Sequence, residues 1–341
     1  MVTEEIISDI AFKTYIAGVP LYRQEMLFKE KGLQLSRQTM VNWLDKVYDQ
    51  YLIPLYEMIQ EDFRKLSYVH LDETTHKVIK NKATRSTSYE LIGLSGRSEK
   101  TRISLYKYSK GRDRSIVDAL VGKDFHGIFQ TDGYQPYQSY CEHHAYAYNC
   151  GCWSHANVKF KEALNIDDVY KKICKLPKEE QLDSLKKHPY LLEFVRIKQL
   201  ISRLFEIEEE ITNEFSGNWD QIRQKRQELC LPIVESIMAK ARKLEGVFPD
   251  KSKRGKAIGY ILNQEKYLRR YLEDGRVEMT NLPAERNAKR FVLWRKNSLF
   301  SFSEGGAERM SVYMTLLMTA RANHLDALSY VNISDNINRD F

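Results

Sequence analysis

The chain has 341 residues, of which 43% are hydrophobic and 11% aromatic, so it is long enough for two or three domains with buried cores. It contains no run of about 18 uncharged apolar residues, which argues against a membrane-spanning helix. Its first residues, up to Ser8, are acidic where a signal peptide is basic and then apolar. We therefore expect a soluble, cytoplasmic protein with no membrane partner.

Charge and cysteine content narrow the possible functions further. The net charge is +7, and five basic residues with no acid lie between Arg286 and Lys296. This cluster favours a phosphate-bearing partner, with a solvated helix face as the alternative. The five cysteines include no Cys-x-x-Cys pair, which argues against both a disulfide framework and a zinc knuckle.

The first region, residues 1–65, has helical periodicity without strand-like alternation. Residues 21–31, then Gly32, then a segment that Ser36 can cap, predict two helices joined by a turn. A second helix of this kind can enter the major groove of DNA and place polar side chains at base edges. Its outward residues in this chain are Arg37, Gln38 and Asn42.

The next region, residues 66–163, changes to strand-like alternation with two short helical segments. Strands are expected at residues 68–74, 88–95, 102–108, 127–131 and 145–150, and helices at 113–121 and 134–140. The order βββαβαβ is typical of an α/β fold with a ribonuclease H-like mixed sheet, in which the first and fourth strands are central neighbours. That arrangement would place Asp72 and Asp132 side by side at one end of the sheet.

The remainder is helical. A helix with Ser154 as its N-cap is expected after the last strand, and residues 164–275 read as a large helical insertion into the core. Its expected segments are 191–213, 219–244 with a break near Pro232, and 256–271. Residues 276–341 would complete the core with a helix capped by Asn281, a loop at 301–306, a helix at 307–323 and a loose tail.

Three carboxylates stand out against this framework. Asp72 and Asp132 each end an apolar strand-like run, and Glu285 opens the basic helix. Carboxylates on two strand ends and a helix are suited to hold two divalent cations about 4 Å apart for in-line attack on a phosphodiester. Each also has a purely structural interpretation, because Asp72 and Asp132 can form turns and Glu285 can complement a helix N-terminus.

Other residues near these carboxylates are weaker candidates. His70 shares a strand face with Asp72 and is either an accessory group or a buried core histidine, whereas Glu73 points to the opposite face. His155, on the helix after the last strand, is a second possible accessory group. For the aromatic residues of this region core packing is expected, with stacking on nucleotides as the alternative: Tyr134, Tyr137, Tyr140, Trp153 and Trp294.

Four blocks of the sequence resemble, in order, those of transposases of insertion-sequence family 66. They are His-Leu-Asp-Glu-Thr-Thr, Gln-Thr-Asp-Gly-Tyr-Gln-Pro-Tyr, Gly-Cys-Trp-Ser-His-Ala-Asn-Val-Lys-Phe, and Asn-Leu-Pro-Ala-Glu-Arg-Asn-Ala-Lys-Arg-Phe-Val-Leu-Trp-Arg-Lys-Asn-Ser-Leu-Phe. The resemblance runs from Tyr22 to about Tyr330. Four separate blocks in the same order make it specific.

The resemblance implies a DDE transposase with a ribonuclease H-like core, and Asp72, Asp132 and Glu285 as its catalytic triad. It implies two Mg²⁺ (or Mn²⁺) ions per active site, which the triad would bind. The partners would be double-stranded DNA at the element ends and target, further copies of the chain, and small accessory proteins of the element. The protein would be prokaryotic and associated with the nucleoid. DNA contacts are expected from Arg286, Lys289, Arg290, Arg295 and Lys296 in addition to the first region.

Two other functions fit the sequence. A ribonuclease H-like nuclease or resolvase would cut DNA without strand transfer, although the long insertion and the basic helix favour the transposase. A decayed, noncatalytic transposase could instead act as a repressor that binds DNA through the helix-turn-helix segment.

Overall fold

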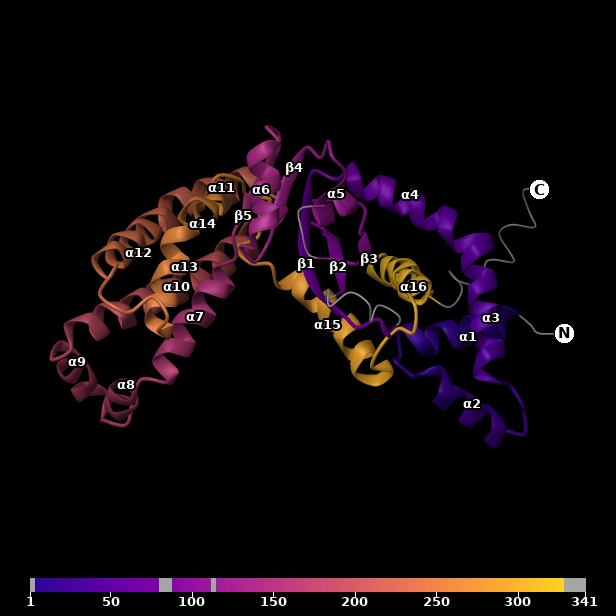
Figure 1. The fold of residues 1–341 in the computed structure, drawn as a ribbon. Helices are drawn as coiled ribbons and strands as arrows, with labels where there is room; N and C mark the ends of the chain where they lie inside the picture. Colours follow the sequence, from indigo (N-terminus) through magenta and orange to yellow (C-terminus); the bar gives the residue numbers. More distant parts are fainter. Residues whose placement is uncertain (1–3, 80–87, 112–114, 328–341) are drawn as a thin grey trace. The chain divides into compact units, whose positions relative to one another are not determined.

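The computed structural model describes residues 4–79, 88–111 and 115–327 (Figure 1). Within them the chain divides into two compact units. The first unit comprises residues 1–129, 135–147 and 282–341, and the second comprises 130–134 and 148–281. The predicted helical insertion, 164–275, lies within the second unit.

A five-stranded mixed sheet has the order β3-β2-β1-β4-β5. The strands are β1 (Tyr68–His76), β2 (Ser88–Ser95), β3 (Ser104–Ser109), β4 (Gly127–Gln130) and β5 (Ala147–Cys150). β1 pairs antiparallel with β2 and β2 with β3, which confirms the predicted meander. β1 and β4 are neighbours, as predicted from the order of the elements.

The helices between the strands are α5 (Ser115–Val121) and α6 (Gln135–His143). The predicted start of the first of them, near residue 113, lies outside the described residues. β1 is two residues longer than predicted because Thr75 and His76 continue the ladder opposite Tyr89 and Ser88. β5 begins later than predicted because the backbone N–H of Ala147 is turned back onto the carbonyl of His144.

The described residues of the first region form helices joined by short loops and no strand, as predicted. It contains α1 (Glu4–Tyr15), α2 (Leu21–Glu30), α3 (Arg37–Val47), a π-helix (Tyr48–Leu52) and α4 (Ile53–Arg64). Ser36 is the N-cap of α3, because its Oγ accepts a hydrogen bond from Thr39 N at 3.1 Å. Gly32, at φ +80°, forms the turn between α2 and α3.

Two helices complete the first unit. α15 (Leu282–Ser298) lies alongside β1, and α16 (Glu304–Ala322) lies beside β3 (Figure 1). The prediction that α16 begins at residue 307 was wrong. The Oγ of Ser303 accepts a hydrogen bond from Gly306 N at 3.2 Å, and this N-cap starts the helix three residues earlier.

α16 hydrogen-bonds to the outer edge of β3, the strand at one end of the sheet order. Tyr106 N donates to Thr315 Oγ1 at 2.8 Å, and Ser104 N donates to Thr319 Oγ1 at 3.1 Å. Two strand residues rise about 6.6 Å and four helical residues about 6 Å, so the hydroxyl row matches the row of edge N–H groups. Asn323, one turn further on, bonds the backbone two positions before Ser104. The helix therefore takes the place of a sixth strand.

We expect Thr315→Val to lower the free energy of unfolding by about 1–3 kcal/mol, because the buried N–H of Tyr106 loses its acceptor. Thr315→Ser keeps the hydroxyl and serves as the control. Denaturant unfolding measures the difference, and hydrogen exchange should show faster exchange at Tyr106. Equal stability of the valine and serine variants would show that the hydroxyl row contributes nothing to the fold.

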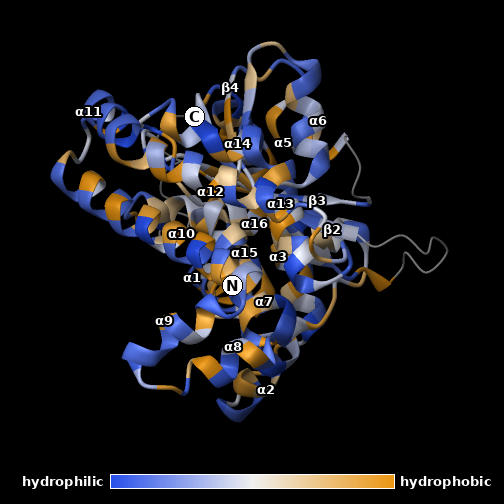
Figure 2. Ribbon diagram, turned by 90° about the vertical axis from the view of Figure 1, so that its left-hand side faces the viewer, coloured by the Kyte–Doolittle hydropathy of each residue, from blue (hydrophilic) through white to orange (hydrophobic). Residues whose placement is uncertain are grey.

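The second unit is built mainly from helices. They are α7 (Trp153–Asn165), α8 (Asp168–Ile173), α9 (Lys178–Lys186), α10 (Pro189–Glu214), α11 (Trp219–Lys225), a π-helix (Arg226–Cys230), α12 (Leu231–Lys243), α13 (Lys253–Asn263), α14 (Glu265–Arg269) and a 3₁₀ turn (Arg270–Leu272). Hydrophobic and hydrophilic residues alternate along α10 (Figure 2), and its buried positions include Leu204, Ile207 and Ile211. Among the described residues, no helix is both long and apolar enough to cross a membrane.

Three features of these helices differ from the prediction. α7 begins at Trp153 rather than after Ser154, because Trp153 N is satisfied by the carbonyl of Met279 at 3.1 Å and no side-chain cap is needed. The predicted break near Pro232 is the π-helix that precedes it. The last segment begins at Lys253 because Ser252 caps it through Gly255 N at 3.0 Å.

The π-helix of the second unit contains a completely buried arginine, Arg226. Its guanidinium binds the carboxylate of Glu208 with two hydrogen bonds, one of them Nε to Oε2 at 2.8 Å. It also donates to the carbonyls of Tyr271, Asp274 and Val277 at 2.7–3.0 Å. A buried charge is tolerated only when paired and fully hydrogen-bonded, so Arg226 ties α10 to the segment that leads into α15.

Candidate active site

Asp72 lies in β1 opposite Ile92 of β2 and is half-buried. Its Oδ1 accepts a hydrogen bond from the backbone N–H of Glu73 at 2.9 Å. The carboxylate of Glu73 accepts a hydrogen bond from the hydroxyl of Tyr137 in α6 at 2.6 Å. Adjacent strand residues point to opposite faces, so Glu73 is used to fix α6 while Asp72 faces the other way.

Glu285 lies in the first turn of α15, four positions after Asn281 and two after Pro283, and is half-buried. This helix packs along β1 and β2 of the same unit. Its next turn is fixed to β3, because the hydroxyl of Tyr106 donates to the carbonyl of Asn287 at 3.1 Å. The strand that carries Asp72 and the helix that carries Glu285 are therefore packed together within the first unit.

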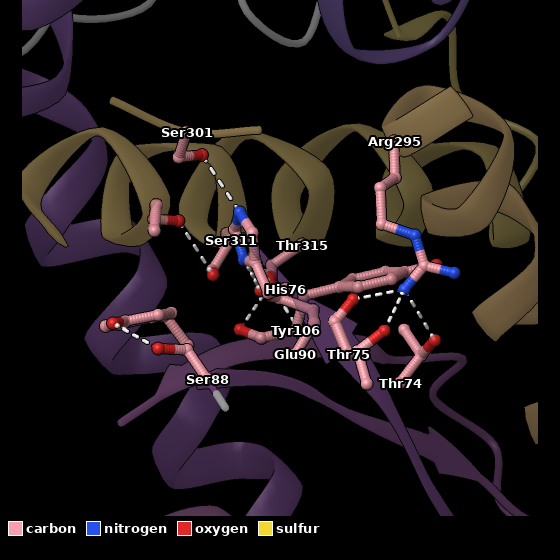
Figure 3. Close-up of polar contacts among 12 residues, drawn as sticks. Thr74, Thr75, His76, Ser88, Glu90, Tyr106, Arg295, Ser301, Ser311 and Thr315 are labelled. Atoms are coloured by element: carbon pink, nitrogen blue, oxygen red, sulfur yellow. Dashed lines mark hydrogen bonds and ion pairs between the residues drawn. The ribbon is translucent and has the colours of Figure 1, made fainter. Parts of the chain in front are cut away.

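Arg295 fixes the far end of α15 to β1 (Figure 3). Its Nη1 donates to the hydroxyls of Thr75 at 2.5 Å and Thr74 at 3.3 Å, and to the carbonyl of Thr75. A guanidinium that binds two hydroxyls and a carbonyl holds the helix at a fixed height along the strand. The DNA contact of Arg295 stays a prediction, and these hydrogen bonds show its structural role.

A buried polar network lies under the end of α15 (Figure 3). His76 of β1 hydrogen-bonds Glu90 of β2 through Nδ1 at 3.0 Å and Ser301 through Nε2 at 2.9 Å. The side chains of His76 and Glu90 are completely buried. The rings of Phe291 and Trp294, both on α15, meet the imidazole of His76 edge-on at centroid distances of 4.9 and 5.9 Å.

Burial raises the pKa of Glu90, although hydrogen bonds with His76 and with Ser311 of α16 act in the opposite direction. Removing a carboxyl group from water disfavours its charged form, and the burial effect is the larger one here. The network connects β1, β2, α16 and the segment after α15. It therefore couples the position of α15 to the centre of the sheet.

Asp132 lies in the second unit, in a tight turn after β4. Its Oδ1 accepts a hydrogen bond from Tyr134 N at 2.9 Å, and Gly133 between them has φ +95°. The hydroxyl of Tyr260 in α13 donates to the carbonyl of Asp132 at 3.2 Å. The predicted turn-forming role of Asp132 is thus real, and a residue of the helical insertion supports the turn.

The structure brings two of the three predicted carboxylates, Asp72 and Glu285, into one unit. Asp132 belongs to the other unit, so the meeting of all three stays a prediction. His70 is completely buried beside the ring of Tyr68, which fits the core interpretation. His155 is half-buried on α7 of the second unit, and its accessory role stays a prediction.

The predicted DNA-contacting residues are mostly exposed. On α3 the side chains of Arg37, Gln38 and Asn42 are exposed, and Gln38 Nε2 donates to Asn42 Oδ1 at 2.9 Å. This pair presents amide donors and acceptors of the kind that can hydrogen-bond to the edge of a base. The exposed basic residues of α15 are Arg286, Lys289, Arg290 and Lys296.

Sequence reasoning missed the network of His76, Glu90 and Ser301. The available signal was a charged residue inside the apolar run of β2, which requires a buried partner. The partner of Glu90, His76, could not be identified because it lies on another strand, and Ser301, which bonds His76, lies 225 positions after it in sequence. For the aromatic residues core packing is confirmed at Tyr137, Tyr140 and Trp153, which are completely buried, and at Trp294, which is 6% exposed.

Comparisons with known proteins identify a family and several relatives. The sequence profile described as "Transposase IS66 family" matches residues 1–309. Three proteins of Sinorhizobium fredii, each described as uncharacterized, are similar along almost all of this chain. The protein y4qI is 29% identical over 97% of this chain and 58% of its own length. The proteins y4jD and y4hP are each 26% identical, over 97% and 96% of this chain and 61% and 57% of their own lengths. The chain therefore spans about three fifths of the length of these relatives.

We expect Glu90→Gln to change how stability depends on pH. A carboxyl group whose pKa is raised by folding stabilises the fold fully below its unfolded pKa, about 4.3, and loses this contribution as pH rises through the folded value. As pH rises from about 4.3 through the folded pKa of Glu90, the wild type should therefore lose stability relative to Glu90→Gln, as measured by urea unfolding at successive pH values. Glu308→Gln, at an exposed site, should follow the wild type. Parallel curves for wild type and Glu90→Gln would contradict the raised pKa.

Proposed function

The chain belongs to the IS66 family of transposases, and we propose that it catalyses metal-dependent cleavage at transposon ends and strand transfer into target DNA. The family is one of DDE transposases, which fits a polynucleotidyl transferase. Because the chain spans only part of its relatives' length, the activity is proposed for the whole protein. The observation that carries the proposal is the packing of the Glu285 helix on the Asp72 strand inside a transposase-family chain.

We propose that the core is ribonuclease H-like and that Asp132 joins the other two carboxylates. β3 runs parallel to β1, and the chain reaches β4 from β3 through α5, the usual way to add a parallel strand. Ile128 N donates to the carbonyl of Ser67 at 2.9 Å, which aligns the starts of β4 and β1. Asp72 follows Ser67 by five positions and Asp132 follows Ile128 by four. At about 3.3 Å per residue, parallel strands would carry both to a similar height.

Asp72, Asp132 and Glu285 would hold two Mg²⁺ or Mn²⁺ ions, because carboxylate oxygens are the hard ligands that these ions prefer. When bound, such ions lower the pKa of the attacking hydroxyl and stabilise the leaving oxygen of the phosphodiester. The protein contributes rigidity. Arg295 and the His76 network hold α15, the sheet holds Asp72, and the Tyr260 hydroxyl supports the turn of Asp132.

The proposed substrate is double-stranded DNA, both at element ends and at the target. Gln38 and Asn42 on α3 present an exposed amide pair for base edges, while the basic residues of α15 suit the phosphate backbone. The proposed partners also include further copies of the chain and accessory proteins of the element. The proposed location is the nucleoid. A nuclease without strand transfer would use the same carboxylates, so the joined product is what separates the two activities.

We expect Asp72→Asn, Asp132→Asn and Glu285→Gln each to abolish strand cleavage with Mg²⁺ while DNA binding remains nearly unchanged. Loss of one anionic ligand removes the charge that holds the ions, at a cost of about 10³-fold or more in rate. The exposed Glu308→Gln is the matched control. Gel assays of labelled element ends measure cleavage and joining. Normal cleavage by Asp132→Asn would remove that residue from the mechanism, and no cleavage by wild type on any end sequence would favour the repressor.

We expect Gln38→Ala and Asn42→Ala to weaken binding to the element end by about 1–3 kcal/mol and to leave nonspecific binding nearly unchanged. Lys289→Ala should instead weaken binding to all sequences alike and reduce its salt dependence. Fluorescence anisotropy with specific and random duplexes compares the two. Equal losses on both duplexes for the α3 variants would mean that α3 does not read the sequence.

A further inference from the structure

Three large apolar side chains are exposed together just after α15. Leu299 is 63% exposed, Phe300 38% and Phe302 62%. We call these three residues the apolar tip. Isolated exposed apolar residues are common, but three within four positions form a concentrated apolar feature that indicates a binding surface.

The apolar tip is held rigidly by the residue in its middle, Ser301. Ser301 N donates to the carbonyl of Lys77 at 2.9 Å, and Ile79 N donates to the carbonyl of Ser301 at 3.0 Å. The Oγ of Ser301 bonds the buried His76 (Figure 3). Because side chains alternate along extended backbone, anchoring Ser301 inward directs its two phenylalanine neighbours outward. The tip is therefore presented from a fixed base.

The backbone of the tip is also strained. Leu299 has φ +69°, in the left-handed region that glycine and asparagine adopt far more easily than leucine. A leucine in this conformation is disfavoured because its Cβ comes too close to the following carbonyl oxygen. Since its side chain is largely exposed, core packing does not explain why a leucine occupies this position. Strain of this kind is typical of functional surfaces.

A basic stripe leads along α15 to the tip. Arg286, Lys289, Arg290 and Lys296 are exposed at helical spacing, with the 57% exposed Leu293 between them. The sequence from residue 286 to 303 contains no acidic residue. The surface therefore suits a partner that combines a row of negative charges with apolar faces, as DNA does where its bases are unstacked.

We propose that the apolar tip is a wedge that enters DNA between neighbouring bases while the basic stripe holds the adjacent phosphate backbone. Apolar side chains inserted in this way stabilise an unstacked base step, at a cost that the backbone contacts offset. The proposal rests on DNA being the substrate and adds that the bound DNA is locally opened. By opening a base step, the tip would give access to a phosphodiester that is less accessible in a fully stacked duplex.

The test is a binding experiment in EDTA with the full chain, so that cleavage plays no part. The probe is a short duplex that carries the fluorescent base 2-aminopurine beside a nick, because its fluorescence rises when it unstacks. The variants are Phe302→Ala and Leu299→Gly, of which the second removes the side chain but suits the backbone conformation. Phe302→Leu keeps an apolar wedge, and Met58→Ala, at an equally exposed apolar site on α4, is the matched control.

At saturating protein, Phe302→Ala and Leu299→Gly should reduce the fluorescence rise about fivefold or more, because the inserted apolar side chain that offsets the cost of unstacking is lost. Phe302→Leu and Met58→Ala should keep it. An unchanged rise in both tip variants, or no rise with wild type, would overturn the wedge. So would tip variants that lose self-association in sedimentation while still unstacking DNA, since the tip would then be an interface between copies.

The two proposals fail separately. If the wild type unstacks the probe but never cleaves DNA with Mg²⁺, the transposase activity fails and the wedge stands. If it cleaves DNA while both tip variants unstack the probe as well as wild type, the wedge alone is wrong. Thermal unfolding of each variant confirms that any loss reflects the missing side chain rather than a misfolded first unit.

Discussion

The first unit depends on one constraint, which is that α15 must keep a fixed position along β1. Its carboxylate, Glu285, lies at one end of the helix, so a small rotation or slide at the other end would move it. Arg295 prevents the slide because it donates hydrogen bonds to the hydroxyls of Thr74 and Thr75. The buried hydrogen bond between His76 Nε2 and Ser301 Oγ, at 2.9 Å, opposes rotation, because a movement of the chain just after α15 would leave both groups unsatisfied in an apolar interior.

The helical insertion supports the turn that carries Asp132. Asp132 lies in a turn whose carbonyl is held by Tyr260, a residue that arrives about 130 positions later in the chain. An added Cβ at Gly133 would lie 3.0 Å from Oε1 of Gln264, which is tighter than an ordinary contact, and the φ of +95° also favours glycine there. The turn and the insertion are thus matched to each other, and changes in α13 will be felt at Asp132.

The sequence predicted the features that depend on local chemistry. Strand alternation identified the five strands of the described sheet. Ser36 caps α3, as expected of a serine just before a helix. The helix start at Trp153 differs from the prediction because Trp153 N bonds the distant carbonyl of Met279. The start at Lys253 differs because Ser252 caps that helix. For the site, residue types could be inferred from sequence, but distances could not. The roles of Arg295 and His76 depend on partners that only folding brings close.

The hydroxyl row of α16 has a consequence for how copies of this chain can assemble. An exposed edge strand offers its backbone to any neighbouring chain and invites pairing between molecules. Here Thr315 and Thr319 already occupy the N–H groups of β3 at 2.8–3.1 Å. A second copy therefore cannot extend the sheet at β3 without displacing a buried helix. Association on that side must rely on side-chain surfaces, which can be made and broken while the sheet stays intact.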